Sequence, residues 1–225
     1  MNIENFHQIR SECKSYDATL VAVSKTKSNE EITQVYDQGQ RDFGENYVQE
    51  LKDKQLSLPN DINWHFIGHL QSNKVKSIVP LVSLIHGCDS LSLLMEIDKQ
   101  AKKQDKVVNC LLQVYIASEE TKFGFTEEEI EILVKNIQKE SLSNTSIIGM
   151  MGMASFTEDT SQIRKEFKSL YKIFSEYQNS SFSIPGFEMK ILSMGMTSDY
   201  KIALEEGSNM IRIGSAIFGE RNYKK

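Results

Sequence analysis

Short segments of β-type sequence alternate with segments of helical sequence along the whole chain, and this alternation limits the fold more than any other feature. The β-type segments are apolar, rich in β-branched residues and, as at 20–23, too short for an ordinary helix. We expect strands at 20–23, 42–46, 64–68, 84–88, 107–116, 146–154, 190–194 and 210–214. Strands separated by helical crossovers run parallel. Eight such units in 225 residues predict a closed (β/α)8 TIM-type barrel, with a doubly wound open sheet as the alternative because periodicity does not detect closure.

The helical segments carry signals for where each helix begins and ends. Ser28 and Glu31 have the spacing of a capping box, and so do Thr126 and Glu129. Gly207 is placed to end the last of the long helices. We expect helices over 3–16, 28–39, 47–55, 73–79, 94–101, 126–137, 163–174 and 198–206.

Composition excludes several classes of protein. With 26 Lys and Arg against 31 Asp and Glu, the formal charge is −5, which argues against a broad nucleic-acid surface or a polybasic membrane anchor. No apolar run reaches the ~18 residues of a membrane span, and the first residues lack the apolar core of a signal peptide. Cys13, Cys88 and Cys110 are too widely spaced for a disulfide framework. We therefore expect one domain, 1–225, in the cytoplasm.

Two loops near the end of the chain are candidates for binding a phosphate group. In (β/α)8 barrels, phosphate commonly binds the loops after strands seven and eight. Here these loops contain Ser193 and Gly195, and Gly214 and Ser215. Small residues allow close approach of the backbone to an anion, and hydroxyls donate to its oxygens. The alternative, that the glycines merely turn the chain, stays open.

Lys25 ends the first expected strand and is a candidate nucleophile. Strand alternation places it on the same face as Val21 and Val23, which in a barrel is the inner face. A lysine at the mouth of an apolar barrel loses hydration, which favours the neutral amine that attacks carbonyl groups. An exposed lysine at a strand end is the alternative. Lys27 lies beyond the strand, where we expect it to be solvated.

Arg212 lies between Ile211 and Ile213 in the last expected strand. Alternation directs the two isoleucines outward and Arg212 inward, where a cation needs an acceptor. Either a ligand or an inner carboxylate meets that need. His65, His69, His86 and Cys88 do not have a recognised metal-ligand spacing, so we predict no metal site.

Several of these segments together resemble the pyridoxal phosphate homeostasis protein family, the YggS/PROSC-like proteins. The matching stretches cover nearly the whole chain in the expected order: LVAVSKTK (20–27), FGENYVQE (43–50), WHFIGHLQSNK (64–74), GMMGMA (149–154), LSMGMTSDY (192–200) and MIRIGSAIFGER (210–221). That family is similar in fold to the N-terminal barrel of alanine racemase, the fold type III group of pyridoxal 5′-phosphate (PLP) proteins.

The resemblance implies that PLP is the cofactor and that the candidate residues form one site. Lys25 would form a Schiff base with the cofactor aldehyde, and Arg212 would face the pyridine nitrogen. A phosphate site of Ser193, Gly195, Gly214 and Ser215 is implied as well. By the same analogy Asn46 lies near the ring, while the role of Lys122 stays open.

The resemblance also implies a function without efficient catalysis. Fold type III racemases take a catalytic tyrosine from a second domain; here the sequence ends at Lys225, and Tyr223 lies in a charged tail. We therefore expect a monomeric carrier that holds PLP reversibly and supplies PLP-dependent apo-enzymes. The first alternative is a PLP-dependent amino-acid racemase or lyase of fold type III. The second is a barrel enzyme acting on phosphorylated metabolites.

Overall fold

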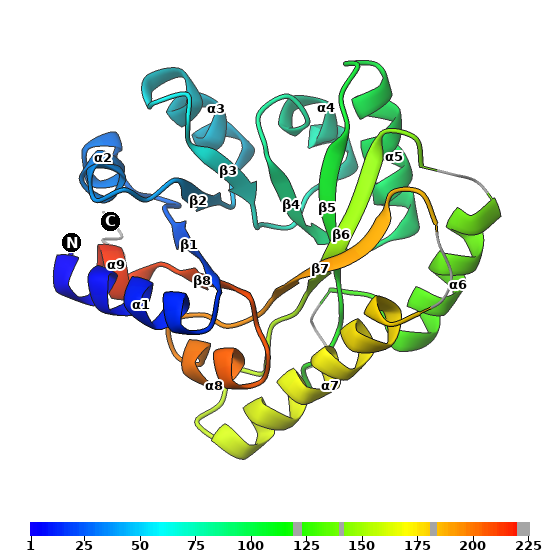
Figure 1. Ribbon diagram of the computed structural model, residues 1–225. Helices are drawn as coiled ribbons and strands as arrows, with labels where there is room; N and C mark the ends of the chain where they lie inside the picture. The colour runs from blue at the N-terminus through cyan, green and yellow to red at the C-terminus, as the bar shows by residue number, and fades with distance from the viewer. Residues whose placement is uncertain (119–122, 140–141, 181–183, 220–225) are drawn as a thin grey trace.

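The eight strands close into a parallel barrel that is surrounded by helices (Figure 1). The computed structural model describes residues 1–118, 123–139, 142–180 and 184–219. Each strand pairs in parallel with the next, and β8 pairs with β1. The strands are β1 Thr19–Val23, β2 Asp42–Glu45, β3 Asn63–Phe66, β4 Leu84–Cys88, β5 Val108–Gln113, β6 Thr145–Met151, β7 Phe187–Ser193 and β8 Met210–Ile213. The predicted (β/α)8 barrel is confirmed.

Helices follow the strands around the outside of the barrel. They are α1 Ile3–Ser15, α2 Asn29–Asp37, α3 Val48–Ser57, α4 Val75–Ile78, α5 Leu91–Lys102, α6 Glu127–Lys139, α7 Thr160–Gln178, α8 Tyr200–Glu205 and α9 Ser215–Phe218. Both predicted capping boxes form: Ser28 caps α2, and the Thr126 hydroxyl and the Glu129 carboxylate exchange hydrogen bonds with each other's backbone N–H. Gly207 follows α8 with a φ of +93°, as a helix-ending glycine should.

Several boundaries differ from the prediction; for example, the strands expected over 107–116 and 146–154 end at Gln113 and Met151. The helix expected over 73–79 is a 3₁₀ turn, Ser72–Lys74, followed by the single turn of α4. Strand β7 begins at Phe187, directly after Gly186, whose φ of +75° makes the turn into the strand. Helix α9 was not predicted, because one helical turn is too short to produce a periodic pattern.

Strand alternation separates an inner core from an outer core. Apolar side chains that point into the barrel form a small cluster: Val21, Leu84, Leu111, Met151 and Met210. Their strand neighbours, such as Ala22 and Ile211, join the larger cluster beneath the helices. Parallel strands with both faces covered must carry apolar residues on both sides. Polar side chains inside the barrel, such as Ser193 and Arg212, are therefore exceptions to this pattern.

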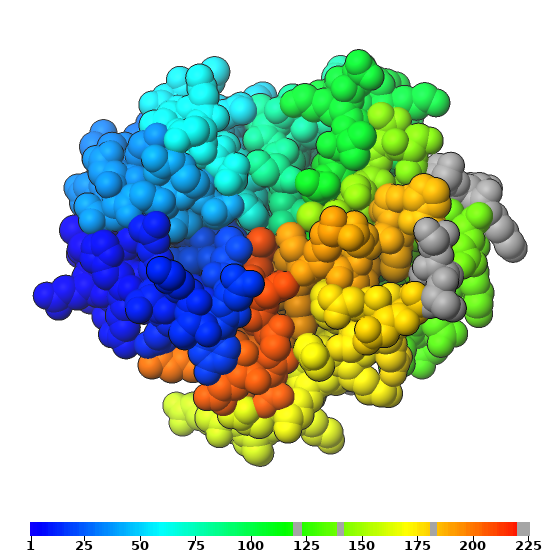
Figure 2. All heavy atoms as spheres, viewed as in Figure 1, coloured from blue at the N-terminus to red at the C-terminus, as the bar shows by residue number. Residues whose placement is uncertain are grey.

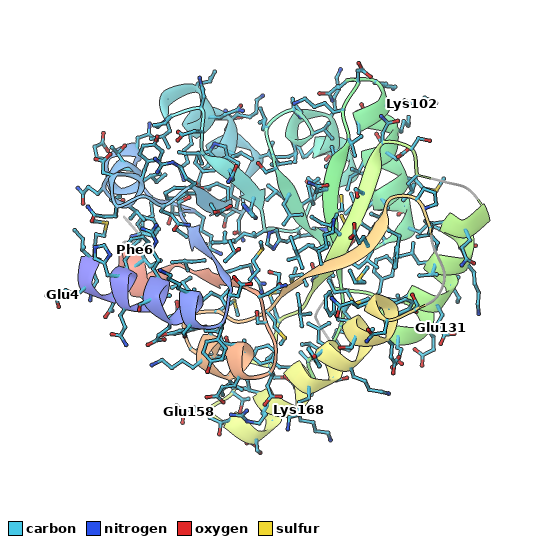
Figure 3. The ribbon with its side chains drawn as sticks, viewed as in Figure 1. Glu4, Phe6, Lys102, Glu131, Glu158 and Lys168 are labelled. Atoms are coloured by element: carbon cyan, nitrogen blue, oxygen red, sulfur yellow. The ribbon has the colours of Figure 1, made fainter. Side chains whose placement is uncertain are left out.

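The two end regions of the chain lie side by side. Helix α1 packs on α9, and the Asn2 N–H donates to the Ile217 carbonyl at 2.8 Å (Figure 1). The Tyr200 hydroxyl donates to Glu12 at 2.8 Å, and the two segments appear in Figure 2 as blue atoms next to orange ones. Charged side chains of the outer helices, including Glu4, Lys102, Glu131 and Lys168, point away from the strands in Figure 3.

Gly149 permits the close approach of β6 to β7. The register shifts at this residue on the β7 side, and a Cβ built there lies 1.9 Å from the Ile191 carbonyl oxygen. Because that atom is backbone, the strands must separate to admit a methyl group. We expect Gly149→Ala to lower the free energy of unfolding by about 3 kcal/mol, measured by urea denaturation. Ser146→Ala on the same strand serves as the control, and equal stability of the two variants would contradict this packing argument.

Candidate functional site

A cavity of about 490 Å³ opens at the carboxyl ends of the strands. Its lining combines apolar and polar side chains from six strand ends: Val23, Lys25, Lys27, Asn46, Ile67, Met153, Phe156, Met196, Thr197, Ser198, Arg212, Gly214, Ser215 and Gly219. A larger hollow of about 860 Å³ lies outside the barrel between α5 and α6. Active sites of this fold lie at the carboxyl ends of the strands. The 490 Å³ cavity is therefore the candidate site.

Lys25 lines this cavity directly after β1, as alternation predicts. The backbone on both sides of it is anchored by α3. Lys54 donates to the Ser24 carbonyl at 2.8 Å, and Glu50 accepts from the Thr26 N–H at 2.7 Å. Thr26 has a φ of +64°, a left-handed conformation that a β-branched residue rarely adopts. These contacts fix the position from which the Lys25 side chain enters the cavity.

A buried ion pair lies behind Lys25 and was not predicted from the sequence. Lys54 of α3 donates to the Glu45 carboxylate at 2.7 Å, and the Ser24 hydroxyl donates to the same oxygen at 2.6 Å. Burial raises the pKa of Glu45, while the Lys54 charge opposes that rise. Because Lys54 bonds the Ser24 backbone as well as Glu45, the pair couples α3 to the end of β1.

Arg212 lies on the inner face of β8 and reaches the cavity. It is 5% exposed; its Nη1 donates to the Ser193 hydroxyl at 2.6 Å and its Nη2 to the Gly152 carbonyl at 3.2 Å. Burial lowers its pKa to about 10, so the guanidinium remains charged at neutral pH. The acceptors are thus a hydroxyl and a carbonyl. A guanidinium has five N–H donors, and these contacts within the described chain use two of them.

Two predicted phosphate residues lie outside the lining of the cavity. Ser193 is fully buried and bonds Arg212 and His86. Gly195 has a φ of +99°, and a Cβ there would lie 2.6 Å from the Ala203 methyl group of α8. Gly195 therefore permits the loop to pack on α8. Ser193 is the last residue of β7 and Gly195 follows in the loop, and neither residue is part of the cavity lining.

The polar groups that line this side of the cavity come from the same two loops. Met196, Thr197 and Ser198 follow β7, and the predicted Gly214 and Ser215 follow β8. The Ser215 hydroxyl donates to the Thr197 hydroxyl at 3.2 Å, so the two loops are in direct contact. Three hydroxyls and a glycine backbone at one wall provide groups that can donate to an anion.

Asn46 lines another wall of the cavity at the end of β2. Its Oδ1 is buried and has no hydrogen-bond partner within the part of the chain that the structure describes. A buried amide oxygen without a partner is uncommon, and a ligand at that wall can satisfy it. Lys27, which we expected to be solvated, is not: its side chain is 12% exposed and bonds the Phe218 carbonyl at 3.0 Å and Glu31 at 3.3 Å. Lys122 lies outside the described residues.

The histidines considered as metal ligands make other contacts. His65 and His86 bond each other at 2.9 Å inside the barrel, whereas His69 bonds Asp89 at 3.1 Å outside it. Among the described residues no group of three or more His, Cys, Asp and Glu side chains is arranged to hold a metal ion.

No helix in the described part of the chain is long and apolar enough to cross a bilayer.

The barrel with a lysine after its first strand and an arginine on its last belongs to a recognised class. The family model of the alanine racemase N-terminal domain matches residues 3–222. Alanine racemase of Clostridium difficile 630 superposes with a TM-score of 0.74 at 14% identity, covering 100% of this chain and 58% of that protein. At this level of identity the likeness shows a shared fold.

Closer relatives define the family within this class. Pyridoxal phosphate homeostasis proteins of Aquifex aeolicus and Homo sapiens are 38% and 39% identical, covering 92% of this chain and 88% and 78% of theirs. PipY of Synechococcus elongatus PCC7942, solved with PLP bound, superposes with a TM-score of 0.86 at 32% identity, covering 96% of this chain and 99% of PipY. The chain belongs to the pyridoxal phosphate homeostasis protein family.

Proposed function

We propose that this protein binds PLP in the cavity at the carboxyl ends of the strands and serves PLP homeostasis as a carrier. The observation that carries the proposal is the shared cavity: Lys25, Arg212 and the hydroxyls of two adjacent loops line one space. Its similarity to pyridoxal phosphate homeostasis proteins and to PipY, whose structure contains PLP, supports it. In this proposal the whole chain, 1–225, forms one PLP-binding barrel domain.

The residues present fit this cofactor. The cavity volume lies within the range of about 300–1,000 Å³ that small-molecule sites occupy. The Asn46 oxygen without a partner supplies an acceptor for a ligand donor. Arg212 retains donors beyond those used by Ser193 and Gly152. The cavity thus offers an amine, a buried cation, an acceptor and a hydroxyl-lined wall.

Each group of residues has a proposed role. When bound, PLP supplies an aldehyde that links reversibly to a primary amine, and Lys25 provides that amine. Thr197, Ser198, Gly214 and Ser215 hold the phosphate, while Asn46 contacts the ring. Ser193 bonds Arg212 and does not contact the phosphate. Gly195 allows the phosphate-binding loop to pack against α8.

Arg212 favours binding over catalysis. With a pKa of about 10 it keeps its own proton at neutral pH, so it would donate to the pyridine nitrogen and would not protonate it. A donor of this kind would leave the ring a weaker electron sink for carbanions. A carrier needs a stable, reversible link and no carbanion chemistry. We further propose that the protein acts in the cytoplasm as a monomer and that PLP-dependent apo-enzymes receive the cofactor.

Binding and turnover measured on one preparation test this proposal. We expect one PLP per chain by equilibrium dialysis and amino-acid racemisation or cleavage at the rate of free PLP. Turnover above that rate, abolished by Lys25→Ala, would instead make the protein a PLP-dependent enzyme. Failure to bind PLP together with binding of a sugar phosphate would revive the barrel enzyme of phosphorylated metabolites.

Ser215 offers a test of the phosphate wall. Ser215→Ala removes one hydroxyl from the cavity lining and should weaken PLP binding by about 1.5–3 kcal/mol, the value of a hydrogen bond to a charged acceptor. Pyridoxal, which lacks the phosphate, should bind the variant and the wild type equally. Ser57→Ala, at an exposed serine in α3, is the control. Unchanged PLP affinity would indicate that backbone N–H groups hold the phosphate.

A further inference from the structure

A chain of hydrogen bonds crosses the inside of the barrel from the cavity to the opposite end. Arg212 donates to Ser193 at 2.6 Å, Ser193 Oγ lies 3.2 Å from His86 Nδ1, and His86 Nε2 lies 2.9 Å from His65 Nδ1. His65 Nε2 then lies 3.1 Å from the Asp42 carboxylate. These five side chains come from β8, β7, β4, β3 and β2. Asp42 is the first residue of β2, so the chain ends at the amino ends of the strands.

Strand alternation explains why these residues meet. Trp64 and Phe66 on either side of His65 belong to the outer core, which directs His65 inward. Leu84 belongs to the inner core, and His86 two residues later points the same way. The side chains of this hydrogen-bond chain thus occupy inward-facing positions of their strands. The apolar inner residues around them exclude water from the links between Ser193 and His65.

With both imidazole rings neutral, the chemistry of the two ends sets the direction of every bond. Arginine can only donate, so Ser193 Oγ accepts from Arg212 and has its own proton for His86 Nδ1. His86 then carries its proton on Nε2 and donates to His65 Nδ1, and His65 donates from Nε2 to the Asp42 carboxylate. The opposite tautomers would place the lone pair of His65 Nε2 against that carboxylate. Burial, the neighbouring His65 and the positive charge of Arg212 all lower the pKa of His86, which keeps it neutral.

We infer that His86, supported by His65 and Asp42, is a positioning residue for Arg212 toward the bound cofactor. By accepting a hydrogen bond from the Ser193 hydroxyl, His86 orients the lone pairs of that hydroxyl toward Arg212. This holds the guanidinium in position at the cavity. His86 is fully buried and is not part of the cavity lining, so it acts through Ser193. The inference rests on the proposed function, because it names what orients the group that contacts the pyridine ring.

The protein without ligand provides the first test. The sequence has four histidines, so two-bond ¹H–¹⁵N correlation spectra can be assigned with single-histidine variants. We expect both rings to carry a proton on Nε2 and none on Nδ1, and His86 to be neutral at pH 7. A proton on Nδ1 of either ring, or a charged His86, would reverse or break the chain and overturn the inference.

Two substitutions of His86 give the second test. Asparagine can place its amide oxygen where His86 Nδ1 accepts, whereas leucine offers no acceptor. We expect His86→Leu to bind PLP about tenfold more weakly and to shift the absorption maximum of the bound cofactor at saturation, since that band responds to the ring nitrogen. His86→Asn should restore both values toward wild type. The surface variant His69→Leu is the control.

The outcomes separate this inference from the proposed function. A wild-type protein that binds no PLP overturns both. A wild type that binds PLP, with a His86→Leu variant of equal affinity and an unchanged spectrum, overturns the positioning role alone. If His86→Leu does not fold, the His86→Asn spectrum and the tautomers of the wild type decide. A weaker but spectrally unchanged His86→Leu complex would show a structural role and would also overturn the inference.

Discussion

Replacing Lys25 with methionine should abolish covalent capture of PLP while leaving the barrel folded. Lys25 is half-buried in the cavity lining, and methionine keeps an unbranched chain of similar length without the amine. An amine held beside its reaction partner acts at an effective concentration far above that of a free amine. We therefore expect the apparent affinity for PLP to fall by about a hundredfold or more, measured by equilibrium dialysis, with borohydride-fixed cofactor at background.

Lys27→Met is the matched control for this experiment. Lys27 also lines the cavity, but its ammonium group bonds the Phe218 carbonyl at 3.0 Å and Glu31 at 3.3 Å. We expect the Lys27 variant to retain the covalent link. Loss of the link in Lys27→Met, together with its survival in Lys25→Met, would show that Lys27 and not Lys25 provides the amine. Hydrogen bonds from α3 to the Ser24 carbonyl and the Thr26 N–H fix the backbone on both sides of Lys25. We therefore expect Lys25 to be the nucleophile.

Arg212→Met should produce the second largest effect. Methionine removes the donor proposed for the pyridine nitrogen, and a hydrogen bond to a charged group contributes about 1.5–3 kcal/mol, so retention should fall by about ten- to a hundredfold. The substitution also leaves the Ser193 hydroxyl and the Gly152 carbonyl without their present donor. Removing a buried charge offsets part of that loss of stability, so the fold should be kept. Affinity and absorption spectrum of the bound cofactor are the measurements.

Arg212→Lys separates charge from geometry at the same position. Lysine keeps the positive charge but lacks the planar fork with which Arg212 reaches Ser193 and Gly152 together. We expect an intermediate affinity and a spectrum that differs from wild type. Wild-type affinity and spectrum in both Arg212 variants would remove this residue from the site.

The sequence was sufficient to predict the barrel and the side chains on its inner face. A period of two along each strand directs Val21, Lys25 and Arg212 inward, and the structure has Val21 in the inner core and the other two in the cavity lining. That pattern is local, so it can be read without knowing which strands are neighbours. Once a barrel is assumed, inward-facing residues at adjacent strand ends must share one cavity.

Partners that meet across the barrel could not be predicted in the same way. Ser193 faces Arg212 and His86, and His86 lies 107 positions away along the chain. The Ser193 hydroxyl can bond either a phosphate or a guanidinium, and which group it contacts depends on three-dimensional packing. The Glu45–Lys54 pair depends on how α3 packs on β2. Alternation along 64–66 and 84–86 was the available signal for the inner histidines, since each lies in phase with an inward-facing position.

Borohydride trapping followed by peptide mapping tests the central claim most directly. The purified protein is saturated with PLP, its visible absorption band is recorded, borohydride is added, and the modified peptide is identified by mass spectrometry. We predict that the band disappears on reduction and that the cofactor mass is found on the peptide containing Lys25. A saturated protein without a reducible band, or an adduct on any other lysine, would contradict the account of this cavity as a PLP site built around Lys25.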